Sequence, residues 1–125
     1  MADSSLFHAD ERFLVVDQEA SWWNAKEKCS QQNGYLLEVK TQEDHDRARK
    51  FRIDIDKDIW LGGNDINQEG NWIWDSEGDQ MDMGRFWDDG EPNGDDGNDC
   101  LVIKKEGRFR SNECSKEHYF VCELN

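Results

Sequence analysis

FWDDGEPNGDDGNDC, the stretch from Phe86 to Cys100, is the part of the sequence around which the rest of the chain is organised. It holds five aspartates, one glutamate, two asparagines and the only proline, so it is too polar and glycine-rich for a helix or strand. Long loops in compact domains usually have a function. Clustered side-chain oxygens repel one another unless a cation lies among them, and Ca²⁺ takes about six to eight oxygen ligands. We therefore expect a calcium-binding loop, with the remaining sequence as its scaffold.

The length and charge of the chain limit its organisation and its partners. The chain has 125 residues, which suits one domain spanning residues 1–125. Its formal net charge of -14 favours solubility or bound cations, and it argues against nucleic acid and anionic membrane surfaces as partners. No apolar run approaches the roughly 20 residues of a membrane-spanning helix, so no membrane insertion is expected.

The cysteines indicate the cellular compartment of the protein. There are four of them, Cys29, Cys100, Cys114 and Cys122. The absence of a CxxC pair argues against a zinc or thioredoxin-type site. An even number in a small chain favours two disulfides, with three possible pairings, although four reduced thiols are the alternative. Disulfides form in oxidising compartments, so we expect a secreted, extracellular protein. The start of the chain, MADSSLFHADERF, lacks the basic and apolar stretches of a signal peptide, so secretion is inferred from the cysteines alone.

Apolar periodicity and turn residues predict an α+β fold with both helices in the first half of the chain. Ser21 is expected to cap the first helix, and Thr41 with Asp44 forms a capping-box pattern at the second. Trp72 and Trp74 alternate, so they are expected on one face of a strand. The predicted helices span residues 20–32 and 41–52, and the predicted strands span residues 6–16, 35–39, 59–63, 71–74, 101–104, 108–111 and 119–124.

A set of motifs spread over the chain then points to one family. They are Trp22, Ala25 and Cys29 on the first helix, Trp60-Leu61-Gly62-Gly63, Glu69-Gly70-Asn71-Trp72, Trp74, Glu91-Pro92-Asn93, and Phe120-Val121-Cys122-Glu123. Together they resemble the C-type lectin-like domain, in its short form, from about Phe13 to the end. The resemblance implies two helices flanking small antiparallel sheets, a long calcium- and sugar-binding loop, and the disulfides Cys29–Cys122 and Cys100–Cys114.

The triplet Glu91-Pro92-Asn93 resembles the family version that favours mannose, glucose and fucose over galactose, with a cis proline. The implied function is calcium-dependent binding of mannose-type glycans, as in innate immune recognition of microbes. Two sugar hydroxyls would complete the calcium shell and also bond to Glu91 and Asn93, because a carboxylate accepts hydrogen bonds and an amide both donates and accepts. An ordinary turn is the alternative interpretation, since Pro-Asn-Gly is a common turn sequence.

The resemblance also implies two sets of site residues. The carbohydrate-binding set is Glu91, Asn93, Asn98, Ser111 and Asn112. The calcium ligands are Glu91, Asn93 and Asn98 at the sugar, with Asp65, Glu69 and Asp99 at an accessory site. Trp87 is expected either to pack on a sugar face or to anchor the loop in the core.

Some residues depart from the family pattern. Arg110 and Ser111 stand where an Asn-Asp pair of calcium ligands is usual, and Asn98 stands where glutamate is usual. Asn112 would substitute as a ligand if its strand carried a bulge. Alternatively, the Arg110 guanidinium would lie near Glu91 and replace the charge of the ion, which would make the site independent of calcium. We prefer retained calcium and sugar binding, because the triplet is intact.

Two other classes of function compete with sugar binding. An interaction module that binds a protein or mineral surface would use the same fold without a sugar pocket. An enzyme is not expected, because the sequence has no nucleophile elbow and no HExxH motif, and His8, His45 and His118 are interpreted as surface groups. The sequence has no heptad stalk, so multivalent binding would need a homodimer or a partner.

Overall fold

The computed structural model describes residues 6–8, 12–92 and 97–125, and within that part of the chain it has two helices and eight strands. Neither helix is long and apolar enough to span a bilayer. The helices are α1 (Trp22–Gln31) and α2 (Gln42–Ile55). The strands are β1 (Leu6–His8), β2 (Phe13–Ala20), β3 (Gly34–Leu36), β4 (Ile59–Asn64), β5 (Ile73–Trp74), β6 (Cys100–Ile103), β7 (Phe109–Asn112) and β8 (His118–Leu124).

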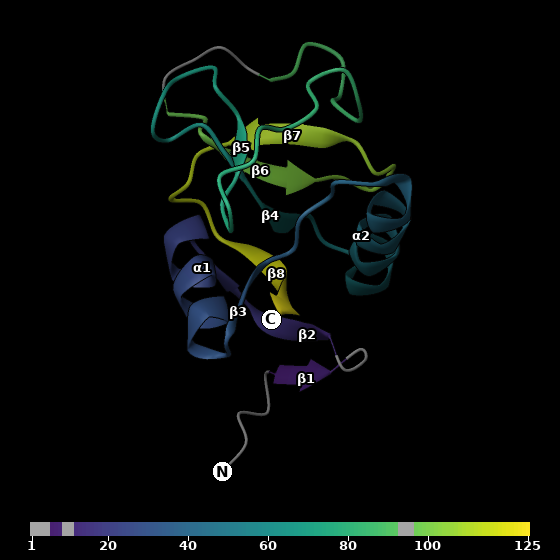
Figure 1. Cartoon of the computed structure of the whole chain (residues 1–125). Coiled ribbons are helices and arrows are strands. Elements are labelled where there is room, and N and C mark those ends of the chain that lie inside the picture. Colours follow the sequence, from purple (N-terminus) through teal and green to yellow (C-terminus); the bar gives the residue numbers. More distant parts are fainter. Residues whose placement is uncertain (1–5, 9–11, 93–96) are drawn as a thin grey trace.

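The strands form one mixed sheet in the order β1-β2-β8-β4-β6-β7, with β3 beside β8 and β5 beside β4. The expected antiparallel pairing holds for every pair except β4 and β8, which run parallel. The helices flank the sheet on two sides, and the long segments between β4 and β6 extend from the end of the molecule opposite β1 (Figure 1). This arrangement places the described parts of the acidic loop at one end of the sheet (Figure 1).

Helix α1 forms where the sequence predicts it, because Trp22, Ala25 and Cys29 recur at helical spacing and are all buried. The Ser21 side chain accepts a hydrogen bond from the Asn24 N–H, which fixes the first turn. Cys29 is joined to Cys122 of β8, and Cys100 is joined to Cys114. Both disulfides implied by the resemblance are therefore confirmed.

Helix α2 begins with the predicted capping box of Thr41 and Asp44, but it continues three residues beyond Arg52 to Ile55. The predicted acidic turn began too early, because Asp54 is neutralised within the helix by an ion pair with Lys50, at 3.1 Å. Ile55 packs against the hydrophobic core, which gives this last turn an apolar anchor. The helix then ends at Asp56, whose φ of 61° is left-handed.

Several tryptophans lie in the core. Trp60 is fully buried, and Trp72 and Trp74 are each 3% exposed, so these two side chains share the buried face as predicted. The indole of Trp22 donates to the Leu61 carbonyl at 2.9 Å and ties α1 to β4. The predicted first strand is instead a pair, since Leu6 of β1 lies opposite Val16 of β2.

Candidate functional site

The start of the acidic loop is held along the edge strand β7. The Phe109 N–H donates to the Phe86 carbonyl at 2.7 Å, and the Asp88 N–H donates to the Phe109 carbonyl at 2.9 Å. Trp87 packs edge-on against Trp72, with ring centroids 5.1 Å apart, and it also contacts Phe109 at 6.1 Å. Trp87 therefore anchors the loop in the core, one of its two expected roles.

His45 also holds this loop, which corrects its interpretation as a surface residue. It is 9% exposed, stacks on Phe86 with ring centroids 3.9 Å apart, and its Nε2 lies 2.7 Å from the Gly107 carbonyl. The polar neighbours of His45 in sequence lie on other faces of α2, so the local sequence gave no sign of this burial. The ring connects α2 to the loop and to the turn between β6 and β7.

The acidic residues of the loop have separate partners. The Lys104 ammonium donates to Asp88 at 2.8 Å, and this hydrogen bond, with a second from the Asp89 N–H, holds the pKa of the Asp88 carboxyl below its usual value. Asp88 is thus an ion-pair partner of the β6–β7 turn. Asn93, Asp95 and Asp96 lie outside the described residues.

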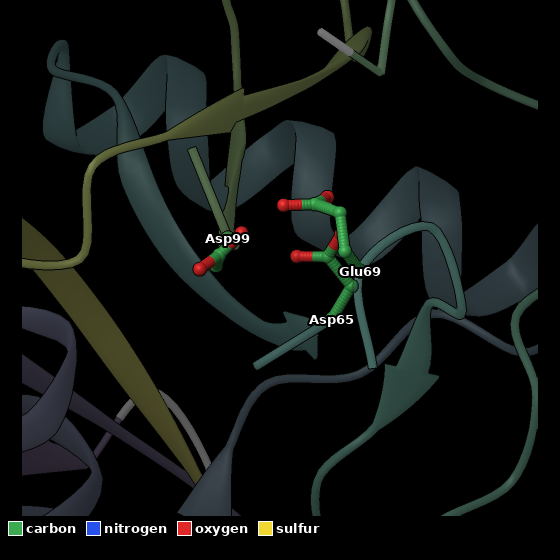
Figure 2. A group of neighbouring side chains, drawn as sticks. All are labelled: Asp65, Glu69 and Asp99. Atoms are coloured by element: carbon green, nitrogen blue, oxygen red, sulfur yellow. The ribbon is translucent and has the colours of Figure 1, made fainter. Parts of the chain in front are cut away.

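Three other carboxylates converge as the resemblance implies. Asp65, Glu69 and Asp99, called here the acidic cluster, each offer an oxygen within 4.8 Å of the others. Asp99 approaches from the end of the loop, opposite Asp65 and Glu69 (Figure 2). The Asp65 N–H donates to the Asp99 carbonyl at 3.0 Å, and Asp65 Oδ2 accepts from the Gly70 N–H at 2.8 Å. Backbone contacts thus fix Asp65 at the base of the cluster.

The donor set of the acidic cluster fits Ca²⁺. Asp65 is only 2% exposed, and its Oδ1 is buried without a hydrogen-bond partner among the described residues. Leaving a buried acceptor unsatisfied costs about 1–3 kcal/mol, and adjacent carboxylates add repulsion. A hard cation with oxygen ligands would relieve both costs.

Glu91 lies in a different environment, which we call the Glu91–Ser111 pair. The Glu91–Pro92 peptide is cis, as the resemblance implies. The Ser111 N–H donates to Glu91 Oε1 at 2.8 Å, and the Ser111 hydroxyl donates to the same oxygen at 2.7 Å. Ser111 is 4% exposed, so a buried strand residue holds the half-buried Glu91 carboxylate.

The neighbours of Ser111 do not take up the roles expected of them. Strand β7 pairs with β6 in unbroken register, from Phe109 opposite Ile103 to Asn112 opposite Cys100, so the bulge suggested for Asn112 is absent from this strand pair. Alternation buries Phe109 and Ser111 and exposes Arg110 on the other face. The ion pairs between described residues include none between Arg110 and Glu91, so the alternative in which Arg110 replaces the ion at Glu91 gains no support from them.

Asn112 is engaged on the side away from Glu91. Its Oδ1 accepts from the Glu113 N–H at 2.8 Å, and its Nδ2 lies 3.3 Å from His118 Nε2. His118 is half-buried rather than a surface residue, and it meets the Trp60 ring edge-on at 4.7 Å. Burial, as the largest cause, lowers the pKa of His118 below 6.5.

The described part of the Glu91 site does not fit Ca²⁺. Glu91 belongs to no group of three or more carboxylate, histidine or cysteine ligands within the described residues, where the acidic cluster alone qualifies. The amide oxygen of Asn112 already accepts a hydrogen bond from the Glu113 N–H. The resemblance assigned Glu91 to a site at the sugar and Asp65, Glu69 and Asp99 to an accessory site, and Glu91 is likewise not a member of the acidic cluster.

Comparisons with known proteins agree with this architecture. The family described as "Lectin C-type domain" matches residues 18–124. The hepatic lectin of Gallus gallus is 33% identical over 104 residues, covering 82% of this chain and 49% of that protein. The mouse scavenger receptor C-type lectin carbohydrate-recognition domain has a TM-score of 0.83 at 20% identity, covering 99% of this chain and 98% of its own.

A Ca²⁺-dependent type II antifreeze protein, in its Ca²⁺-free form, has a TM-score of 0.81 at 19% identity, covering 99% of this chain and 100% of its own. Likeness to solved structures at this level of identity shows the fold alone. The chain spans 25% of the length of the C-type lectin domain family 4 member M of Pan troglodytes and 49% of that of the hepatic lectin.

Proposed function

The chain belongs to the C-type lectin domain family, and on that premise we propose that it is a single carbohydrate-binding domain whose binding depends on calcium. The observation that carries the proposal is the acidic cluster, because Asp99 ends the same loop that carries Glu91. Bound at the cluster, Ca²⁺ would supply the charge that keeps Asp99 against Asp65. Loss of the ion would release one end of the loop and weaken sugar binding through it.

The preferred ligand is a mannose-type glycan. Glu91 presents an acceptor for a sugar hydroxyl, and Ser111 fixes its orientation at 2.7 and 2.8 Å. Asn93 and Asn98 are proposed to complete the polar contacts. The names of the relatives, a hepatic lectin and a carbohydrate-recognition domain, support a sugar as the ligand class.

The setting we propose is extracellular, because the two disulfides suit an oxidising compartment. Recognition of microbial glycans in innate immunity is the proposed role. One sugar site gives weak binding, so the proposal includes a homodimer that gains avidity from two sites.

Retention on mannose-agarose, with elution by EDTA, tests this function. We expect retention with calcium, release by EDTA, and little retention of Glu91→Gln. Asp89→Asn, at an exposed loop position, is the matched control and should behave as wild type. The pair Glu91→Gln and Asn93→Asp should shift preference toward galactose. An unchanged sugar preference in this double variant would contradict the proposal that the ligand is a mannose-type glycan.

The second candidate is a surface-binding module, which the likeness to an antifreeze protein favours. Trp23 is 51% exposed and offers a flat aromatic face on a strongly acidic molecule. If the chain ignores every sugar on a glycan array but adsorbs to calcium carbonate or ice, this alternative replaces the lectin proposal. Trp23→Ala should then reduce adsorption.

A further inference from the structure

The Glu91 carboxylate accepts two hydrogen bonds at one oxygen. A carboxylate oxygen has two lone pairs, and Ser111 donates to Oε1 from both its N–H and its hydroxyl. Hydrogen bonds to an ionised acceptor are stronger than neutral ones, and these two come from a buried residue. Because Oε1 is filled in this way, Glu91 cannot offer both oxygens to a metal ion.

The strand behind Glu91 adds donors where a calcium site needs acceptors. Ser111 stands at the position where the family resemblance leads us to expect a carboxylate, and it presents two hydrogens to Glu91 instead. Its place in β7 is fixed by pairing with Leu101 of β6, so a rearrangement that turned its hydroxyl oxygen toward an ion would also leave its N–H facing that ion. In the Glu91–Ser111 pair, a carboxylate is held by two hydrogen-bond donors.

We propose that Glu91 binds its sugar hydroxyl directly, with no calcium ion between them, in an orientation set by Ser111. The inference rests on the proposed carbohydrate-binding function and deepens it. Ser111 is a positioning residue, and calcium binding is confined to the acidic cluster. Calcium therefore affects sugar affinity only through the loop that joins Asp99 to Glu91.

Preorganisation gives this arrangement its physical advantage. A free carboxylate on a loop must be ordered before it can select one sugar hydroxyl, and that ordering costs affinity. Two hydrogen bonds from a buried strand fix the Glu91 side chain before the sugar arrives. Ser111 thereby provides the orientation that a calcium ion would otherwise impose.

Calcium titration by calorimetry tests the metal-free assignment. We expect Glu91→Gln to leave the number of bound ions unchanged and their affinity within about twofold of wild type. Asp65→Asn should abolish the binding at the acidic cluster. If Glu91→Gln removes one bound ion, or weakens calcium binding by about tenfold or more, the proposal is overturned.

Sugar titration with methyl α-mannoside at saturating calcium tests the role of Ser111. Ser111→Ala loses one of two charge-assisted hydrogen bonds, so we expect sugar affinity to fall about tenfold while calcium affinity holds. Ser111→Thr keeps the hydroxyl and should restore most of the sugar affinity. Ser115→Ala, at an exposed serine, is the matched control. Equal sugar affinity in wild type and Ser111→Ala would contradict the positioning role.

A gain of calcium binding provides an independent check. Ser111→Asp replaces the donor hydroxyl with a second carboxylate beside Glu91, and we expect one additional bound calcium ion relative to wild type. An unchanged ion count when Ser111→Asp is folded would argue that serine is not what excludes the ion. If wild type binds no mannoside, the proposed function fails, whereas the calcium titrations of Glu91→Gln still decide the metal-free assignment.

Discussion

The acidic cluster and the Glu91–Ser111 pair lie at two ends of one loop, yet they use their carboxylates differently. In the cluster, three carboxylate oxygens lie within 4.8 Å of one another, and one buried oxygen of Asp65 has no hydrogen-bond partner within the part of the chain that the structure describes. In the pair, one carboxylate oxygen accepts two hydrogen bonds from a single serine. The first arrangement attracts a cation, whereas in the second the carboxylate oxygen is already hydrogen-bonded to two donors. The surrounding strands, rather than the number of acids, thus determine what each carboxylate can bind.

The register of β6 accounts for this division. Cys100 lies opposite Asn64 of β4, which places Asp99 beside Asp65 on one side. On the other side of β6, Leu101 lies opposite Ser111 of β7, which carries the donors for Glu91. Strand β6 therefore has Asp99 and the acidic cluster on its β4 side and the Glu91–Ser111 pair on its β7 side.

The largest expected effect is loss of calcium binding in Asp65→Asn. The amide removes a charge at the buried base of the cluster while leaving an oxygen for the Gly70 N–H. For wild type, calcium at 100 times its dissociation constant should raise the free energy of unfolding by about 2.7 kcal/mol. Denaturant unfolding with and without calcium measures this gain, which the variant should lack.

Asp89→Asn is the control for this measurement, because it removes one acidic charge at an exposed loop position. It should keep the full calcium-dependent gain. An equal calcium-dependent gain in the unfolding free energy of Asp65→Asn would show that calcium binds elsewhere. The acidic cluster would then not differ from the Glu91–Ser111 pair in binding calcium.

A smaller loss of calcium affinity is expected when the Cys100–Cys114 disulfide is replaced by two alanines. The bridge spans 14 positions, and closing a loop of this size contributes about 3 kcal/mol to the free energy of unfolding. Cys100 follows Asp99 and Cys114 lies shortly after Ser111, so both calcium and mannoside affinities should fall. Thermal unfolding and the two titrations measure these changes. If only one affinity falls, the two regions are mechanically independent.

The smallest effect is a pH dependence carried by His118. Burial lowers the pKa of His118 below 6.5 in the folded state, so the unfolded state binds its proton more readily. Its contribution to stability is therefore complete above pH 6.5 and is lost as the pH falls below that value. His118→Gln should reduce the difference in unfolding free energy between about pH 7.5 and about pH 5.5.

Because His118 contacts Asn112, the acid-induced loss should affect mannoside binding at the pair before calcium binding at the cluster. Urea unfolding and both titrations at the two pH values separate these effects. An identical pH dependence in wild type and His118→Gln would show that His118 does not cause the pH dependence of stability.

Much of the scaffold could be predicted from the sequence because its signals are local. The capping residues Ser21 and Thr41 and the helical spacing of Trp22, Ala25 and Cys29 act within a few residues of one another. The end of α2 was predicted too early, since the packing of Ile55 against distant core residues extends the helix. His45 was misassigned for the same reason, because its burial comes from Phe86 and Gly107.

For the site, the sequence by itself determined which residues carry oxygen ligands, and its resemblance to the family implied that Asp65, Glu69 and Asp99 form a set. That information lies in motif spacing and survives any small shift of the backbone. Only the tertiary structure decided that Ser111, and not Arg110, meets Glu91. The alternation of β7 places neighbouring residues on opposite faces, so a one-residue difference in register would have exchanged their roles. Such a choice depends on pairing between strands, which local sequence does not specify.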